Sequence, residues 1–435
     1  WDTTRGSSTI EVAVFDTGIA YQHLDLTNNM SDVGYNTISS IQSVAAADDD
    51  HFHGTHVAGT IAATNNTIGV TGVAPLVKLV PVKVLAANGS GNLSDVIDGI
   101  TWVIARNAAG HHIRVINASL GGTGACWEGM QTAINAAYDA GILFVAAAGN
   151  SNANASGFVP ANCAKVMTVG AVNNSFAKAS FSNFGSSVEL AAPGVGILNT
   201  VPAASGDYGT LSGTSMAAPH VAGVAALVIS HHPSLTTAKV YNILTSSVTT
   251  VKGLKGVVST SGVLNAYKAV IAAGKYSISG QVQDASSNVV MGVKISSACG
   301  TATTKSTGRY EIANISDGRS CTVAGTIGGF SCTTASATIA EDSVSAANLT
   351  CTINSTTYSP VLTLKKKKTN QAIKSAAVTA VILANGVQVA TGTTDSSGRV
   401  TLTGLPGGAT IVILSAGVKA TVAVSSNSGK TLTLL

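Results

Sequence analysis

The sequence predicts an α/β domain over residues 1–274, in which helices cover both faces of a parallel sheet, followed by two small all-β sandwich domains over 275–357 and 358–435. Three observations predict this order. A chain of 435 residues is too long for one compact core. In the first part, short apolar runs alternate with helical stretches. After Gly274 the chain becomes alternating and rich in Thr, Val and Ser, broken by Gly and Asn, with no segment typical of a helix.

The alternation in the first part can be followed element by element. Buried strands are expected at four short apolar runs: Ile10–Phe15, Leu79–Leu85, Val115–Leu120 and Ile142–Ala147. Helices are expected at four stretches between or after them: Thr55–Ala63, Ser94–Ala109, Met130–Ala140 and Ser215–Ser230. This alternation predicts parallel strands covered on both faces, because each helix carries the chain back across the sheet.

An internal repeat divides the C-terminal part into two units. Residues 307–318 align with residues 397–408 at a constant offset, and both copies have a Gly-containing turn, an alternating strand and a second Gly turn. This arrangement is typical of a β-sandwich meander. The boundary between the two units is expected near Tyr358-Ser359-Pro360.

Composition and charge exclude several classes of protein. Apolar residues make up 45% of the chain and charged residues 10%, which is typical of a globular rather than a disordered chain. The net charge is only +4, and we interpret the one basic run, Lys365–Lys368, as a solvated strand edge or linker, so no nucleic-acid partner is expected. No apolar stretch reaches the roughly 18 residues that span a bilayer, so no membrane association is expected. Because the chain begins at Trp1, any signal peptide or pro-segment is expected to lie outside this sequence.

The cysteines point to an oxidising compartment. There are six, an even number, spread widely and without CxxC spacing. This pattern favours disulfides in a secreted, extracellular protein over a zinc ribbon or a thioredoxin-like motif, with free buried thiols as the alternative. Four of them lie in the middle domain, where three pairings are possible: Cys299, Cys321, Cys332 and Cys351.

Three motifs carry the chemistry, and they occur in the order Asp, His, Ser. Asp16, within VAVFDTGI, ends an expected strand, at the edge where open parallel sheets place their sites. His53, within HGTHVAGT, begins an expected helix. Ser215, within GTSMAAPH, lies in the first turn of another, where backbone N–H groups and the helix dipole can stabilise a developing oxyanion. Singly each motif could be a turn or a helix cap, but three such motifs in this order on a βα scaffold are very unlikely to occur together by chance.

Over about residues 1–274 the sequence resembles the subtilisin family of serine proteases, with GTSMAAPH and HGTHVAGT as the most specific motifs. The resemblance implies a secreted serine endopeptidase that hydrolyses peptide bonds in proteins through an acyl-enzyme intermediate. Ser215 would attack the scissile carbonyl, His53 would take its proton and return it to the leaving amine, and Asp16 would fix the tautomer of His53 and stabilise its charged form. Asn150, within VAAAGN, would donate its side-chain amide to the oxyanion beside the backbone N–H of Ser215.

The resemblance also implies a substrate groove. Its expected lining is Gly89, Ser90, Gly91, Ser119, Leu120, Gly121, Ala147, Ala148 and Gly149. Residues 119–121 and 147–149 would form the two walls of the pocket for the side chain that precedes the scissile bond. Residues 89–92 would form the edge that pairs with an extended peptide. The expected partners are protein or peptide substrates and a propeptide acting as folding aid and inhibitor.

A structural Ca²⁺ site is expected in and around the loop TNNTIGV. The resemblance implies five ligand residues: Asp25, Thr64, Asn66, Ile68 and Val70. Side-chain oxygens of the Asp and the Asn, together with backbone carbonyls, would face inward around a Gly turn. Oxygen-only ligation suits Ca²⁺. An ordinary Asn-rich turn is the alternative.

Two further features follow from resemblance. Cys126 and Cys163 flank the strand that ends at Asn150, and similar bacterial proteases carry a Cys pair in these loops, which implies a disulfide that braces the pocket walls. Two free thiols are the alternative. Residues 275–357 resemble the carboxypeptidase regulatory-like β-sandwich, and the last unit shares its pattern. Spacer, stability and substrate-tethering roles remain open for these domains.

Two other functions are alternatives to the protease. His51, His53 and His56 form an HxHxxH pattern that could ligate zinc. The intervening Gly54-Thr55 fits the protease motif, however, so zinc is not expected. A structural or adhesive protein could also be built on a catalytically dead protease scaffold. The presence of all four residues expected to act in catalysis speaks against it.

Overall fold

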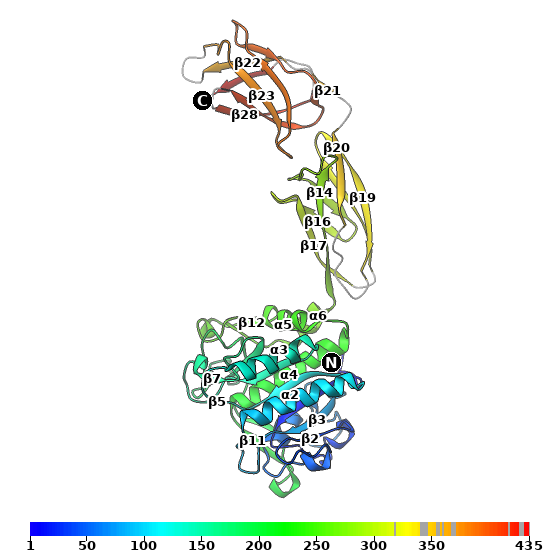
Figure 1. Cartoon of the computed structure of the whole chain (residues 1–435), viewed down its shortest axis with the longest axis vertical. Coiled ribbons are helices and arrows are strands. Elements are labelled where there is room, and N and C mark those ends of the chain that lie inside the picture. The colour runs from blue at the N-terminus through cyan, green and yellow to red at the C-terminus, as the bar shows by residue number, and fades with distance from the viewer. Residues whose placement is uncertain are drawn as a thin grey trace. The chain divides into compact units, whose positions relative to one another are not determined.

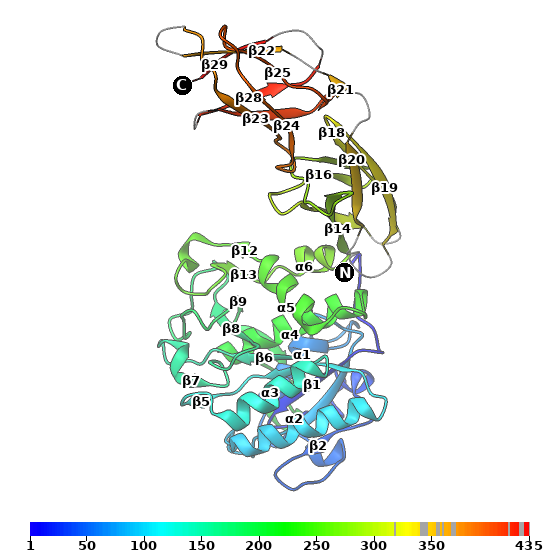
Figure 2. The same cartoon turned by 45° about the horizontal axis from the view of Figure 1, so that its top comes forward.

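The structure is a computed structural model that describes residues 1–316, 319–339, 347–353, 357–358, 361–366, 371–415, 418–425 and 430–434. The chain divides into two compact units, Trp1–Gly274 and Lys275–Leu435 (Figure 1, Figure 2). Parts of three sequence features lie outside the described residues: Ser359 and Pro360 of the expected domain boundary, residues 317–318 of the repeat, and Lys367 and Lys368 of the basic run.

A nine-stranded sheet forms the centre of the first unit. Its strands are β1 (Glu11–Asp16), β2 (Tyr35–Asn36), β3 (Lys78–Lys83), β4 (Ile113–Ala118), β6 (Leu143–Ala147), β8 (Val166–Val172), β9 (Leu190–Pro193), β12 (Thr249–Thr250) and β13 (Gly262–Val263). Their order is β12-β13-β9-β8-β6-β4-β1-β3-β2. All neighbours pair in parallel except β12 and β13. The predicted parallel sheet is confirmed, and the four predicted strands are the adjacent strands β6, β4, β1 and β3.

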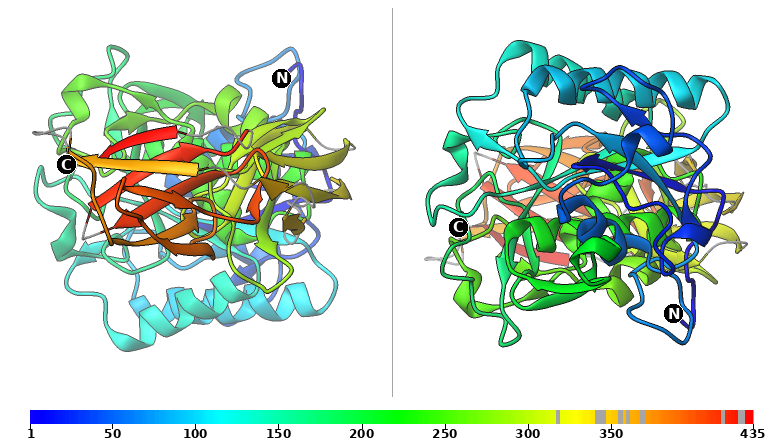
Figure 3. Two further views of the ribbon diagram at one scale, coloured as in Figure 1. Left: turned by 90° about the horizontal axis from the view of Figure 1, so that it is seen from above. Right: turned by 90° about the horizontal axis from the view of Figure 1, so that it is seen from below.

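Helices cover both faces of this sheet. They are α1 (His53–Ala62), α2 (Leu93–Ala108), α3 (Glu128–Asp139), α4 (Thr214–His231), α5 (Thr237–Ser246) and α6 (Ala266–Ala273). Successive residues of a strand face opposite sides, so Val12 and Val14 pack into the core with α1 and α4, whereas Ala13 and Phe15 pack into the core with α2 and α3. Figure 3 shows α2 in cyan and α4 in green on opposite sides of the sheet. None of the helices in the described part of the chain is long and apolar enough to cross a bilayer.

Helix α4 holds the expected nucleophile at its N-terminus. Fourteen of its 18 residues are buried, as is typical of a helix that is apolar on all sides. Gly223 allows the close approach of the neighbouring loop, because a Cβ there would lie 2.7 Å from the Cβ of Val73. The first turn of α4 is therefore anchored by packing along the whole helix.

The second unit contains only strands among the residues that the structure describes. Its longer strands are β14 (Lys275–Asp284), β15 (Lys294–Ser297), β16 (Gly300–Thr303), β17 (Arg309–Ser316), β18 (Ser320–Ile327), β19 (Phe330–Thr338), β20 (Leu349–Ile353), β22 (Val361–Lys366), β23 (Ala377–Ile382), β24 (Gln388–Thr393), β27 (Thr410–Ser415), β28 (Val418–Ala423) and β29 (Lys430–Leu434). Three short ones are β21 (Thr357–Tyr358), β25 (Arg399–Thr401) and β26 (Leu405–Pro406). They form sheets of seven, four, three and two strands. This bears out the predicted β-rich C-terminal region.

One apolar core extends through the second unit. It includes Ile278 and Ile295 from the part before residue 358 and Ile411 from the part after it. Of the three possible disulfide pairings, the structure has Cys299–Cys321 and Cys332–Cys351. The division into domains 275–357 and 358–435 stays a prediction.

Candidate active site

The ends of β1 and the start of α1 bring Asp16 and His53 together. Asp16 is fully buried at the carboxyl end of β1. The Nδ1 atom of His53 lies 2.8 Å from Oδ1 and 3.0 Å from Oδ2 of Asp16. A hydrogen bond at Nδ1 places the acceptor lone pair of the neutral ring on Nε2. His53 is therefore oriented to take a proton through Nε2.

A buried carboxylate that the sequence analysis missed supports this pair. Asp49 accepts hydrogen bonds from Thr17 Oγ1 at 2.8 Å and from the N–H and hydroxyl of Thr55 at 2.9 and 2.6 Å. The hydroxyl of Thr17 in turn accepts from the N–H of Gly54 at 3.0 Å. Asp49 thus ties the residue after Asp16 to the first turn of α1. Its position in the acidic run DDDHFHGT was the only signal in the sequence.

The electrostatics of His53 suit a general base. Burial lowers the pKa of His53, but the charge of Asp16, its hydrogen bond and the charge of Asp49 outweigh burial, so the net pKa is raised. A raised pKa makes the neutral ring a stronger acceptor for the proton of an attacking hydroxyl.

Ser215 lies at the start of α4 and faces the same cleft. Its hydroxyl donates to the backbone carbonyl of Ser119 at 3.0 Å. Ser215 and His53 both line this cleft, and no hydrogen bond joins them among those of the described residues. Catalytic hydrogen bonds commonly tighten only when substrate is bound.

The side-chain carbonyl of Asn150 already accepts two hydrogen bonds. Its Oδ1 accepts from the N–H and the hydroxyl of Thr214, each at 2.9 Å. The hydroxyl of Thr214 also accepts from the N–H of Gly149 at 3.1 Å. This chain of bonds fixes the amide plane and leaves the Nδ2 group to donate to a substrate oxygen. Asn150 and the N-terminus of α4 can therefore act together on a developing oxyanion.

A cleft of about 650 Å³ joins these residues. His53, Asn150 and Ser215 line it. So do all nine residues expected in the substrate groove: Gly89, Ser90, Gly91, Ser119, Leu120, Gly121, Ala147, Ala148 and Gly149. Phe158 lines it too, and His51 and Val96 are further lining residues that the sequence analysis did not assign to the groove.

One wall of the cleft is covalently braced. Cys126 and Cys163 form a disulfide with a Cα–Cα distance of 5.2 Å. Beside it, the short strands β5 (Gly122–Thr123) and β7 (Phe158–Val159) pair antiparallel. The wall that follows Gly121 is therefore held to the Phe158 loop by both a ladder and a cross-link.

The expected calcium loop wraps a buried carboxylate. Asp25 is fully buried, and its oxygens accept from Asn66 Nδ2 at 2.8 Å, from the N–H of Val70 at 3.0 Å and from the hydroxyl of Tyr208 at 2.9 Å. These donors are all neutral, and a buried charge is stabilised most by an opposite charge. At Gly69, where φ is +53°, a Cβ would lie 2.2 Å from Asp25 Oδ2, so only glycine allows the loop to approach the carboxylate this closely.

The residues at this loop therefore fit a hard cation. Asp25 supplies a charged oxygen, and turning over the amide of Asn66 would present Oδ1 in place of Nδ2. The backbone carbonyls of Thr64, Ile68 and Val70 belong to the same loop. This is an oxygen donor set of the kind that Ca²⁺ prefers.

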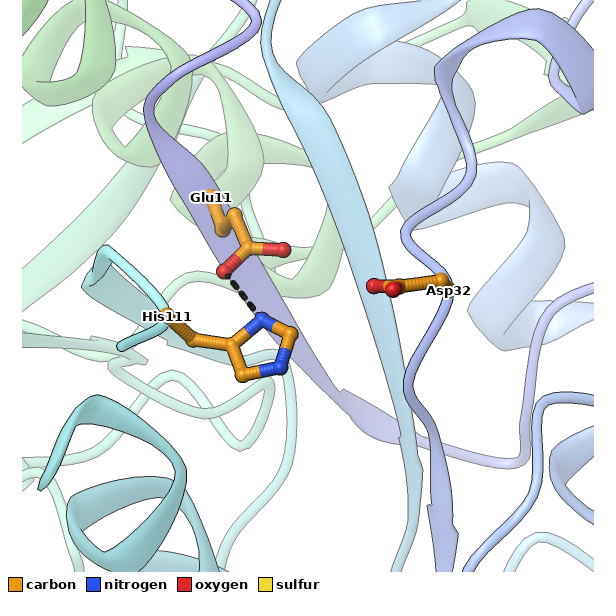
Figure 4. A group of neighbouring side chains, drawn as sticks. All are labelled: Glu11, Asp32 and His111. Atoms are coloured by element: carbon orange, nitrogen blue, oxygen red, sulfur yellow. Dashed lines mark hydrogen bonds and ion pairs between the residues drawn. The ribbon is translucent and has the colours of Figure 1, made fainter. Parts of the chain in front are cut away.

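A second group of possible metal ligands lies near the start of β1, at the end of this strand opposite Asp16. Figure 4 shows Glu11, Asp32 and His111, whose ligand atoms lie within 4.8 Å of one another. The Nδ1 atom of His111 is 3.1 Å from Glu11 Oε2, and the hydroxyl of Ser31 donates to Glu11 Oε1 at 2.6 Å. Both oxygens of Glu11 are thus hydrogen bonded. None of these residues is among the ligands expected from the sequence.

Comparison with known proteins identifies the family. The family model described as Peptidase_S8, the subtilase family, matches residues 7–267. The chain belongs to the subtilase family. This subtilase is 43% identical over 310 residues to an extracellular protease of Xanthomonas campestris pv. campestris. The aligned region covers 63% of this chain and 53% of that protein. It is 47% identical over 247 residues to subtilisin E of Bacillus subtilis, and the aligned region covers 56% of this chain and 61% of that protein. The chain thus spans about half to three fifths of the length of these two relatives.

Solved structures support the fold of the subtilase unit. A protease from Pseudoalteromonas arctica matches with a TM-score of 0.57 at 38% identity, over 63% of this chain and 92% of that one. A cold-adapted subtilisin-like serine proteinase matches with a TM-score of 0.51 at 36% identity, over 60% of this chain and 88% of that one. The predicted subtilisin-like α/β fold is confirmed.

Replacing Asn150 with alanine should lower kcat for a peptide substrate by about 10²- to 10³-fold, the loss known for the oxyanion-hole asparagine of subtilisin. KM should change little, because the Nδ2 group would act on charge that develops only in the transition state. Steady-state kinetics on a chromogenic peptide would measure both constants. Asn174→Ala, on an exposed loop, is the matched control. A fall in kcat of less than about tenfold would contradict a role for Asn150 in the oxyanion hole.

Proposed function

We propose that this subtilase is a secreted serine endopeptidase that hydrolyses peptide bonds in proteins through Asp16, His53 and Ser215. The observation that carries the proposal is the 2.8 Å hydrogen bond between Asp16 and His53, at the edge of a cleft that Ser215 and Asn150 also line. The three disulfides favour an oxidising, extracellular compartment.

In the proposed reaction, the Oγ atom of Ser215 attacks the scissile carbonyl while Nε2 of His53 takes its proton. The negative charge on the carbonyl oxygen is stabilised by Nδ2 of Asn150 and by the N–H of Ser215 at the start of α4. His53 then donates the proton to the leaving amine, and an acyl group stays on Ser215. Water, deprotonated by His53, hydrolyses this ester and restores the enzyme. The carboxylate of Asp16 stabilises the charged ring of His53.

Labelling by a fluorophosphonate probe tests this proposal. The probe reacts with an activated serine, so the folded protein should be labelled on Ser215 and should cleave soluble casein. A folded chain that neither labels nor cleaves casein would overturn the protease and favour the dead-scaffold alternative. If a propeptide inhibits the enzyme, adding that peptide should slow labelling.

We also propose a structural Ca²⁺ held by Asp25, Asn66 and the carbonyls of Thr64, Ile68 and Val70. Chelation by EDTA should then lower the thermal unfolding midpoint by about 10 °C, since a ligand present at 1,000 times its Kd stabilises the folded state by about 4 kcal/mol. Calorimetry would measure the shift. The bound cation would offset the buried charge of Asp25 and so hold the loop closed.

Two variants separate the candidate sites. Asp25→Asn should have a lower midpoint that no longer responds to EDTA. Asp32→Asn, from the group at the other end of β1, should keep the full response. The opposite pattern would place the cation near Glu11 and would overturn the loop site.

We propose that the C-terminal unit consists of two carboxypeptidase regulatory-like sandwiches, at 275–357 and 358–435. We propose that they act as a spacer or tether the enzyme to its substrate. The support for this proposal is the separate apolar core of this unit. Cleavage of soluble casein and of a fibrous protein by the whole chain should be compared with cleavage by a chain ending at Gly274. Loss confined to the fibrous substrate supports tethering, and equal rates on both contradict it.

A further inference from the structure

Helix α4 has a gap in its hydrogen bonding at the nucleophile. In an α-helix the carbonyl of residue i accepts from the N–H of residue i + 4. For Ser215 that residue is Pro219, which lies inside α4 and has no N–H to donate. The carbonyl of Ser215 therefore lacks its regular i + 4 partner, although it belongs to the residue whose geometry matters most for attack.

The side chain of Ser119 fills this gap. Its hydroxyl donates to the carbonyl of Ser215 at 2.8 Å. In return, the hydroxyl of Ser215 donates to the carbonyl of Ser119 at 3.0 Å. Ser119 is only 2% exposed, so water cannot readily replace the hydroxyl that donates to the carbonyl of Ser215. The nucleophile is held at both its side chain and its backbone by one residue that follows the end of β4.

Asn117 determines where the hydroxyl of Ser119 points. It lies in β4, between Val14 of β1 and Val145 of β6, and is fully buried. Its Nδ2 donates to the Oγ atom of Ser119 at 3.0 Å. Because this oxygen accepts a hydrogen bond from Asn117, the hydroxyl of Ser119 is left to donate its own hydrogen bond to the carbonyl of Ser215. The Oδ1 atom of Asn117 has no hydrogen-bond partner within the described ranges, so packing alone does not explain a buried Asn in this strand.

We propose that Asn117 and Ser119 are positioning residues for the nucleophile, and that together they replace the helix hydrogen bond that Pro219 removes. This inference rests on the proposed protease activity of Ser215. The backbone of Ser215 carries both the attacking Oγ atom and an N–H of the oxyanion hole, so a shift of its peptide unit displaces both. The effect is therefore expected in kcat rather than in KM, because replacing Ser119 with alanine removes only the hydroxyl and keeps the backbone of residue 119 in the cleft wall.

A double-mutant cycle on Ser119 and Pro219 tests the replacement. Ser119→Ala removes the donor, whereas Pro219→Ala restores a backbone N–H four residues after Ser215. We expect Ser119→Ala in the wild-type chain to lower kcat on a chromogenic peptide by about 10- to 100-fold, with KM within about threefold. In the Pro219→Ala background the same substitution should cost at least about fivefold less in kcat, because the new N–H takes the place of the hydroxyl.

Equal losses of kcat in the two backgrounds would overturn the proposal, as would a Ser119→Ala enzyme with wild-type kcat. Coupling that appears only in the thermal unfolding midpoint, with kcat unchanged, would show a purely structural bond and would also overturn it. Failure of the wild-type chain to react with a fluorophosphonate would instead refute the proposed protease function, and this outcome is distinguishable because it precedes any comparison of variants.

The role of Asn117 is tested through Ser119. Asn117→Ala should lower kcat in the wild-type chain and have little further effect in the Ser119→Ala chain, since Asn117 acts only through that hydroxyl. Losses that multiply in the double variant would overturn the positioning role of Asn117. Should Asn117→Ala fail to fold, Asn117→Leu offers a side chain of similar size that cannot donate to Ser119, and the same comparison applies.

Discussion

Ser215→Ala should lower kcat for a peptide substrate by about 10⁶-fold, the scale known for loss of the nucleophile in subtilisin. The reason is that the alanine side chain has no oxygen that could attack the scissile carbonyl and form the acyl intermediate. The residual rate should still exceed that of the uncatalysed reaction, because Asn150 and the α4 N-terminus remain able to bind the oxyanion. Active-site titration and steady-state kinetics on a chromogenic peptide would measure the loss.

The matched control for this experiment is Ser205→Ala, in an exposed turn outside the cleft. It should label with fluorophosphonate and turn over at the wild-type rate. Ser215→Ala should lose labelling completely while it unfolds at nearly the wild-type temperature. Retained labelling, or a fall in kcat below about a hundredfold, would mean that another residue is the nucleophile.

Asp16→Asn should lower kcat by about 10⁴-fold with the fold intact. The amide could donate to His53 where the carboxylate accepts, which would favour the wrong tautomer of the ring. It would also remove the negative charge that offsets burial and keeps the pKa of His53 raised. Since attack needs neutral His53, activity rises as the pH increases through this pKa. The acid limb of the kcat/KM profile should therefore move to lower pH in Asp16→Asn.

The pH profile distinguishes this role from a merely structural one. A pH-independent loss of activity, with the acid limb unmoved or moved to higher pH, would contradict the assignment of Asp16. Asp50→Asn is a suitable control. Asp50 lies near the site and pairs with Lys83 but makes no contact with His53 among the hydrogen bonds and ion pairs of the described residues. The acid limb of the kcat/KM profile of Asp50→Asn should stay at the wild-type pH.

Much of the first unit could be predicted from its sequence. The four predicted strands and four predicted helices all end within two residues of the observed β1, β3, β4, β6 and α1–α4. Strands β8 and β9 and helices α5 and α6 were not predicted. The groove residues came from resemblance, and all nine line one cleft. Asp49 could not be recognised from sequence, because the acidic run that contains it is equally typical of an exposed loop.

By itself the sequence determined the features that depend on neighbours along the chain. Apolar runs and helical periods predict strands and helices, and each motif places its reactive residue at the end of one of them. Only the tertiary structure decided which residues meet across the fold. Ser119 and Ser215 are 96 positions apart, and Thr17 and Asp49 are 32 apart. Contacts of this kind depend on how strands pair and how helices pack on the sheet, and no local pattern records them. The hydrogen bond that Pro219 removes can be seen in the sequence, but the hydroxyl that replaces it cannot.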